Sequence, residues 1–286
     1  LEYAMDRNLA PAANATLEDW VVTVDTRSWV DLVFAPIFGV DTVHVDAVAA
    51  AACGEARSAC GLFPIALYQP RFLELYEGGD GCGRPFFLWN GDNPNTQPNC
   101  DLCDCDPIDH DGVNDIVGYE DRTWLDFTND LILADLYGDN CASSGGCGTS
   151  ELVCWVENDS PSQIGIDSCV PGDNGTRAAL AAPTMSRAGD AVKIPIYDYQ
   201  GCDADGYCPG GRTYHISMFG CVRIANPYPW IMQFELAYKD GSTGACWKGK
   251  VIEVSLACHG CSTTCGTPLP GGPPPAWGVA AVALTR

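Results

Sequence analysis

The chain has 286 residues, of which 47% are hydrophobic, and this length and composition are enough for a substantial buried core. It has 37 acidic and 15 basic residues, and its net charge of −22 repels the phosphate backbone of nucleic acids and the surface of anionic lipids. We therefore expect no nucleic-acid partner.

The first elements mix helical and strand patterns. The apolar positions of LEYAMDRNLA fall on one helical face, and we predict a helical segment within residues 1–18 that is the remainder of a longer helix. Residues 19–25 are β-rich, and residues 41–47 alternate as a strand does. Between them, residues 29–40 have helical apolar spacing that is closed by Gly39.

The middle of the chain combines short strands with polar loops. Strands are predicted at 62–68, 86–90 and 151–157. Residues 124–138 are typical of a strand that leads into a helix capped by Asn129, and residues 172–185 of a short helix that stops at Pro183. We expect Cys/Asp-rich loops at 91–118 and 138–150.

The last third alternates strongly between apolar and polar residues. Strands are predicted at 191–199, 214–225, 231–238, 250–257 and 278–285, with a hairpin turn at 239–244. We therefore predict an α+β fold: a mostly antiparallel β-sheet domain with a few short helices and disulfide-braced loops. Residues 19–286 would form this single extracellular β-rich domain.

The 17 cysteines indicate an oxidising compartment, so we predict an extracellular or cell-surface protein. Their spacing lacks the paired C-x₂-C pattern of a zinc finger, which favours disulfides over a cysteine-ligated metal. Pairs that suit small local loops are Cys53 with Cys60, Cys141 with Cys147, and Cys202 with Cys208. The sequence leaves the connectivity open, and the odd number leaves one cysteine free, bonded to another chain or paired elsewhere.

The stretch DCDPIDHDGVND is a candidate calcium loop. Its acidic residues, Asp104, Asp106, Asp109, Asp111 and Asp115, are the candidate metal ligands. Calcium takes six to eight oxygen ligands, which closely spaced carboxylates can supply. When Gly112 is placed at the sixth position of an EF-hand loop, however, Pro107 and Gly118 fall on two positions that should be ligands. A calcium site and a solvated polar loop both remain open at this stage.

Catalytic signatures are scarce. The chain lacks the G-x-S-x-G, H-E-x-x-H and P-loop motifs. His215 and Ser217 share one face of a predicted strand, a placement more typical of ordinary sheet residues. The aromatic stretch 225–234 can stack on a sugar, but aromatic residues at strand spacing more often belong to a core or an interface. We predict that the protein is not an enzyme.

Several phrases of the sequence occur in a characteristic order. They are FAPIFGVDTVHVDAVAAAA at 34–52, CGLFPIALY at 60–68, RTWLDFT at 122–128, AVKIPIYDYQG at 191–201, YHISMFGCVRIA at 214–225 and GVAAVALTR at 278–286. Together they resemble the TadE/TadG-like proteins associated with tight-adherence (Flp-type) pilus assembly. The resemblance spans most of the chain and implies an extracytoplasmic domain, preceded by a hydrophobic helix, that serves pilus assembly or surface attachment. It implies no active-site residues.

These observations predict a non-enzymatic extracellular structural protein: a pilus-associated, TadE/TadG-like subunit or a building block of a surface filament. Its expected partners are copies of itself or other filament subunits. The N-terminal helix and the strand 278–285 can contact a neighbour, although that strand can equally complete its own sheet. The alternative function is a secreted calcium-dependent carbohydrate-binding adhesin or a glycan-active enzyme, with a surface glycan as its ligand.

Overall fold

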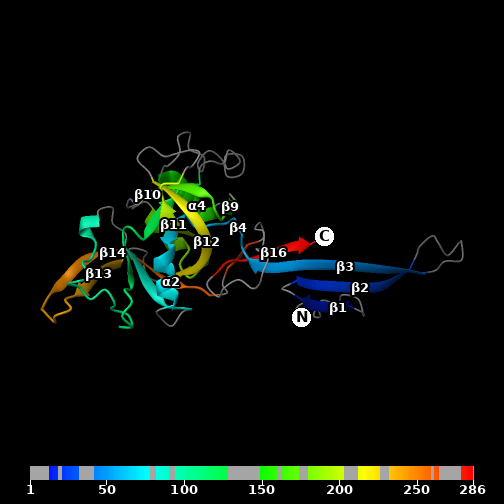
Figure 1. Ribbon diagram of the computed structural model, residues 1–286, viewed down its shortest axis with the longest axis horizontal. Helices are drawn as coiled ribbons and strands as arrows, with labels where there is room; N and C mark the ends of the chain where they lie inside the picture. The colour runs from blue at the N-terminus through cyan, green and yellow to red at the C-terminus, as the bar shows by residue number, and fades with distance from the viewer. Residues whose placement is uncertain are drawn as a thin grey trace.

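The chain folds into a body and a long β-sheet arm that projects from one side of it (Figure 1). The computed structural model describes residues 13–18, 21–31, 42–77, 82–89, 94–127, 149–159, 163–173, 180–202, 212–225, 232–258, 261–263 and 278–285.

The arm is a sheet with the strand order β1-β2-β3-β16-β15. Its strands are β1 (Ala13–Glu18), β2 (Val21–Asp31), β3 (Thr42–Glu55), β15 (Ser262–Thr263) and β16 (Ala280–Thr285). Strand β2 is rich in Val and Thr, which favour extended backbone, and it pairs antiparallel with β3 over its whole length. Along β3, strand β16 pairs with the Ala50–Glu55 end, next to the body. The last predicted strand therefore completes its own sheet.

The body contains a nine-stranded sheet in which five strands close into a ring. Its strands are β5 (Ile65–Tyr68), β6 (Pro85–Trp89), β7 (Ile116–Val117), β8 (Arg122–Leu125), β10 (Cys169–Asp173), β11 (Ala191–Gln200), β12 (Arg212–Ile224), β13 (Met232–Ala237) and β14 (Ala245–Leu256). The ring follows the order β10-β8-β5-β11-β12, and β10 pairs with β12 to close it. Closure removes open sheet edges, and the large side chains of Trp124, Tyr197 and Tyr214 are fully buried there.

In the described part of the chain, three helices and a short two-stranded sheet complete the body. They are α2 (Gln69–Glu77), α4 (Thr149–Asn158), α5 (Ala181–Ser186), the 3-10 turn η2 (Pro94–Thr96), and the strands β4 (Ser58–Ala59) and β9 (Ile164–Gly165). Helix α2 packs against β5 and β11, with Phe72 and Leu75 fully buried. A Cβ atom on Gly220 of β12 would lie 2.8 Å from Cζ of Phe72, so this glycine allows the helix to approach the sheet closely.

The predicted fold class is confirmed: the described chain is mostly antiparallel sheet with few helices and several disulfides. The strand predicted at 151–157 is wrong, because these residues belong to helix α4. Leu152, Trp155 and Val156 are buried at helical spacings of three and four residues. The apparent alternation of apolar and polar residues in this run suggested a strand. The run instead buries one face of a helix.

Other boundaries also differ from the prediction. Within the segment 1–18 expected to be helical, Ala13–Glu18 form strand β1, and residues 1–12 lie outside the described residues. Residues 29–31 of the expected helix 29–40 continue strand β2, and residues 32–41 are not described. Pro183 does not end its helix but lies in the first turn of α5, where a backbone N–H would have no helical acceptor.

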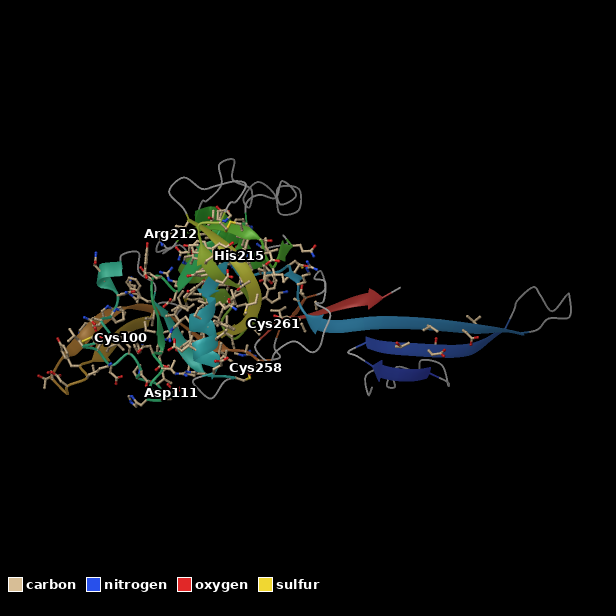
Figure 2. All side chains as sticks on the ribbon, in the orientation of Figure 1. Cys100, Asp111, Arg212, His215, Cys258 and Cys261 are labelled. Carbon is tan, nitrogen blue, oxygen red and sulfur yellow. A yellow bond between two sulfur atoms is a disulfide. The ribbon has the colours of Figure 1, made fainter. Side chains whose placement is uncertain are left out.

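Five disulfides join described cysteines (Figure 2). They are Cys82–Cys258, Cys100–Cys105, Cys103–Cys246, Cys169–Cys202 and Cys221–Cys261. The predicted pair Cys202–Cys208 is therefore wrong, because the ring of strands brings Cys169 of β10 to Cys202. Cys60 and Cys154 are also disulfide-bonded.

Some predictions fall on residues that the structure does not describe. They concern the helix expected after Asn129, the loop 138–150 with Cys141 and Cys147, and Cys208. For Cys53, only the backbone is described, and it pairs with Val282 of β16.

Candidate functional site

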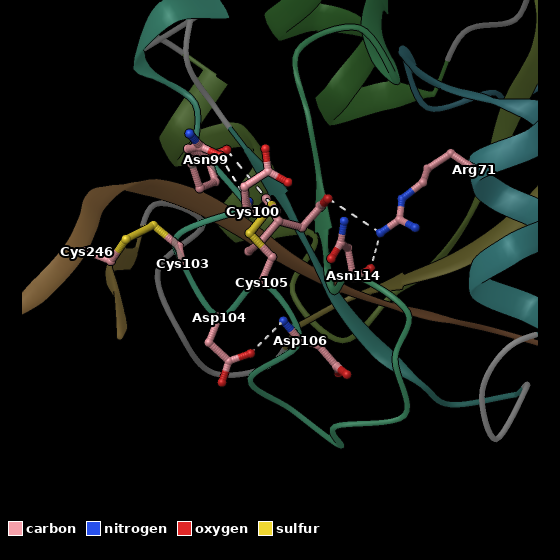
Figure 3. Close-up of a disulfide and its surroundings, with 12 residues drawn as sticks. Arg71, Asn99, Cys100, Cys103, Asp104, Cys105, Asp106, Asn114 and Cys246 are labelled. Carbon is pink, nitrogen blue, oxygen red and sulfur yellow. Dashed lines mark hydrogen bonds between the residues drawn. A yellow bond between two sulfur atoms is a disulfide. The ribbon is translucent and has the colours of Figure 1, made fainter. Parts of the chain in front are cut away.

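The acidic loop lies at one side of the body and is fixed at its start by two disulfides. Cys100–Cys105 closes a short turn, and Cys103–Cys246 ties this turn to β14 (Figure 3). Beneath it lies a small second core that includes Phe87. The loop ends at β7, which pairs in parallel with β6. The sequence was therefore a good guide to a disulfide-braced loop at this place.

Aspartate side chains shape the loop through hydrogen bonds to its own backbone. The Asp106 carboxylate accepts a hydrogen bond from the Gly112 N–H at 2.7 Å, and Asp111 accepts one from the Val113 N–H at 2.8 Å. Asp104 accepts one from the Asp106 N–H at 3.2 Å (Figure 3). Gly112 has a φ of 91°, a conformation that favours glycine. These bonds give the loop a defined conformation.

A buried arginine lies among the aspartates. Arg84, only 3% exposed, donates to both carboxylate oxygens of Asp111, at 2.7 and 3.1 Å. It also donates to Asp115 at 3.2 Å and to Asp109 at 3.5 Å. Burial alone would lower the pKa of Arg84, but its hydrogen bonds to Asp111 and Asp115 raise it. The chain thus provides its own cation for much of the negative charge of the loop.

The same loop keeps two of its carboxyl groups in contrasting environments. Burial raises the pKa of Asp115, although the Ile108 N–H at 2.8 Å and Arg84 favour its charged form. The Val113 N–H and Arg84 together lower the pKa of Asp111. A fully buried acid and a more exposed one therefore share a single guanidinium group.

Three of the predicted ligands also come close enough to share a metal ion. Asp106, Asp109 and Asp115 each offer one oxygen, and these oxygens lie within 4.8 Å of one another. In the described structure, Oδ1 of Asp106 is buried without a hydrogen-bond partner. Calcium prefers six to eight oxygen ligands, so backbone oxygens or water would have to complete the shell. Carboxylate oxygens are suitable ligands for calcium, but a cation bound here would share Asp109 and Asp115 with Arg84.

The remaining two predicted ligands lie apart from this triad. Asp111 is engaged by Arg84 on both oxygens, and Asp104 lies 3.7 Å from Nδ1 of His110. Sequence reasoning missed Arg84, because the contact crosses a long separation and nothing in GCGRPFF indicates it. The nearest available signal was the scarcity of basic residues, which makes each buried one a candidate counter-ion.

His215 and Ser217 do not form a nucleophile–base pair. The Ser217 hydroxyl donates to the backbone oxygen of Ile196 at 3.2 Å, whereas Nδ1 of His215 lies 2.7 Å from Oδ1 of Asp198. The His215 ring also stacks on Tyr199, with ring centroids 4.5 Å apart. Of the aromatic stretch 225–234, residues 226–231 lie outside the described residues.

The chain was compared with protein-family models, curated proteins and solved structures, and none of them matches. Among the described residues, none of the helices has the length and apolar character that a membrane crossing requires. The disulfides indicate a fold that matures in an oxidising compartment, as extracellular proteins do.

Proposed function

We propose that this chain is a non-enzymatic extracellular structural protein, a pilus-associated TadE/TadG-like subunit or a building block of a surface filament. The observation that carries the proposal is the outer part of β3 in the arm. Residues 45–49 of this strand are all exposed, which means that both faces of the sheet are open to solvent there. Such a strand suits contact with another chain.

The exposed part of β3 includes two large apolar side chains. Val45 is 45% exposed and Val48 is 68% exposed, and they lie on opposite faces because side chains alternate along a strand. Burial of apolar area contributes about 25 cal/mol per Å², so covering these side chains would stabilise an assembly. In the arm itself, these side chains are only partly buried.

The backbone edge of β3 supports the same proposal. Among the described residues, β2 alone pairs with Thr42–Ala49, because β16 covers only Ala50–Glu55. An uncovered edge is a template for strand addition. The occupant that we propose is the same edge of a second copy, paired antiparallel and centred on Val45.

The charge of Asp46 and the position of β16 favour this register over its neighbours. Two-fold antiparallel pairing must be centred on a residue, so that opposite side chains share a face. Centring on Asp46 would place two like charges opposite each other, which destabilises a sheet. Centring on Val45 places Val45 opposite Val45, and Asp46 opposite His44 of the second copy. This register also ends before Ala50, where β16 begins.

Analytical ultracentrifugation and electron microscopy of the purified full chain test the proposal. We expect self-associated species or filaments for the wild type and their loss in Val45→Lys, which places two lysines opposite each other. Leu102→Lys is the matched control, because Leu102 is 58% exposed but lies in the body. A monomeric wild type at all concentrations, or equal association of both variants, would overturn this assignment of the arm.

We also propose that the triad Asp106, Asp109 and Asp115 binds a calcium ion. The convergence of their oxygens and the lone buried oxygen of Asp106 support this proposal. Calcium should raise the melting temperature of the wild type, EGTA should reverse the rise, and Asp106→Asn should abolish it. Asp101→Asn is the control, since Asp101 is exposed and lies outside the triad. If calcium leaves the wild-type melting temperature unchanged, the calcium proposal is wrong, and Arg84 is the cation that offsets the negative charge of the loop.

A further inference from the structure

A second polar region, distant from the acidic loop, surrounds the C-terminal end of β11. Figure 2 shows Asp111 and His215 on different sides of the body. Near His215 is an open cavity of about 350 Å³, a size that suits a small ligand. It is lined by Tyr68, Glu120, Asp121, Tyr197, Asp198, Tyr199 and Gln200. Neither the arm nor the acidic loop explains this combination of aromatic rings and carboxylates.

The tyrosine rings form the apolar part of the cavity. Tyr68 and Tyr197 pack with their ring centroids 5.5 Å apart. Tyr199 is 49% exposed, and the His215 ring stacks on one face of its ring. The faces of such rings are electron-rich and attract cations. Tyr197 belongs to the buried core, so Tyr68 and Tyr199 are the rings that a ligand in the cavity can contact.

The charged groups of the lining are all hydrogen-bond acceptors. Glu120, Asp121 and Asp198 carry carboxylates, and one oxygen of Asp198 already contacts His215. The Tyr197 hydroxyl donates to the backbone oxygen of Glu120 at 2.6 Å. A neutral sugar both donates and accepts hydrogen bonds, whereas an ammonium group only donates. The lining therefore complements a cationic donor better than a neutral polyol.

Gln200 adds little donor capacity to the lining. Its Oε1 accepts a hydrogen bond from Arg212 at 2.8 Å, and its side chain also hydrogen-bonds to Tyr197. Lysine and arginine are absent from the lining itself. A cationic ligand can therefore supply positive charge within the cavity.

We propose that this cavity binds a primary ammonium group, carried by a small organic amine or by a lysine side chain. The ammonium would lie against the tyrosine rings and donate to the carboxylates of Glu120 and Asp121. This site is independent of assembly through the arm, because its lining belongs to the body.

The ionisation of Asp121 gives the site a pH dependence. Burial raises the pKa of Asp121, as do Glu120 and Glu74, while Arg71 opposes the rise. Tyr197 and Asp198 of β11 line the same cavity. Protonation removes the charge that the ammonium needs. Affinity should therefore be full above the raised pKa and should fall as the pH decreases through it.

Isothermal titration of the full chain with 1,5-diaminopentane tests the proposal, with 1,5-pentanediol as the neutral analogue of similar length. We expect the diamine to bind and the diol not to bind. A short peptide with one lysine, compared with its norleucine analogue, separates a protein-borne ammonium from a free amine. Binding to the peptide but not to the diamine would assign the site to lysine side chains.

Two variants locate the binding. Asp121→Asn should weaken the diamine about tenfold or more, which corresponds to about 1.4 kcal/mol. Tyr199→Ser, at an exposed position, should weaken it without loss of folding. Glu157→Gln removes the same charge from α4 and should leave the affinity unchanged. Equal weakening in all three variants, no binding of either ammonium probe, or equal binding of the diol or of neutral sugars would overturn the proposal.

Discussion

The sheets of the body and of the arm differ in how their side chains and edges are covered. In the body, five strands close into a ring around large buried side chains, and disulfides tie together segments as far apart as Cys82 and Cys258. In the arm, β2 and the outer half of β3 are extended away from this core, and residues 45–49 expose both faces. The comparison teaches that one chain can carry a sheet closed around a buried core beside a sheet whose faces are left exposed.

Loss of a core side chain in the body should have the largest effect. Phe72→Ala removes a fully buried ring between α2 and β12, and large-to-small changes of this kind cost about 3–5 kcal/mol. Denaturation in urea, followed by tryptophan fluorescence, measures the loss. A change below about 1 kcal/mol would mean that α2 contributes little to the stability of the body.

Removal of the buried guanidinium should rank second. Arg84→Met leaves Asp115 buried without its cation, and the loss of one partner of a buried ion pair costs about 3 kcal/mol or more. The same denaturation experiment applies. Arg223→Met is the control, because Arg223 is exposed and donates a hydrogen bond to the Gly189 backbone oxygen. Equal losses of stability in the two variants would show that the buried ion pairs of Arg84 contribute no more than an exposed arginine does.

The pH dependence of stability should show a smaller effect of Asp111. Its pKa is lowered by the Val113 N–H and by Arg84, so the folded state favours the charged form. The resulting stability is present above the unfolded pKa and is lost as the pH falls through the lowered folded pKa. Asp111→Asn should therefore be less stable than the wild type near neutral pH, and the difference should shrink in acid. A difference that grows in acid would contradict this reasoning.

Changes at the exposed part of the arm should have the smallest effect on folding. Val48→Ser alters a side chain that is 68% exposed, and surface substitutions usually stay within about 0.5 kcal/mol. Its measured free energy of unfolding, taken at a concentration where the protein is monomeric, should match the wild type. A loss of more than about 1 kcal/mol would show that the arm is covered within the monomer.

The sequence predicted local patterns well and long-range contacts poorly. Alternation in the last third identified the strands now seen as β11 to β14, and the turn between β13 and β14 lies where it was expected. Helix α4 was missed, because a short apolar run fits both a strand and a buried helix. Only the burial of Leu152, Trp155 and Val156 distinguishes the two.

The acidic loop illustrates the same limit at a candidate site. Its five aspartates could be read from the sequence, but the division into a triad and an Arg84-bound Asp111 depends on contacts across the fold. Cys202 likewise bonds to Cys169, because β10 and β12 are neighbours in the ring. Neither partner is close in the chain, and local spacing therefore suggested different pairs.

The position of β16 has a consequence for biosynthesis. This strand, at residues 280–285, pairs with residues 50–55, so the sheet at the base of the arm needs a segment that leaves the ribosome more than two hundred residues later. Cys82 likewise needs Cys258, which follows 176 residues later in the chain. Such non-local contacts form slowly and leave strand edges exposed in the meantime. Until residues 280–285 are made, β2 and β3 therefore lack the strand that pairs with the base of the arm, and a chaperone that shields strand edges would act longest at this hairpin.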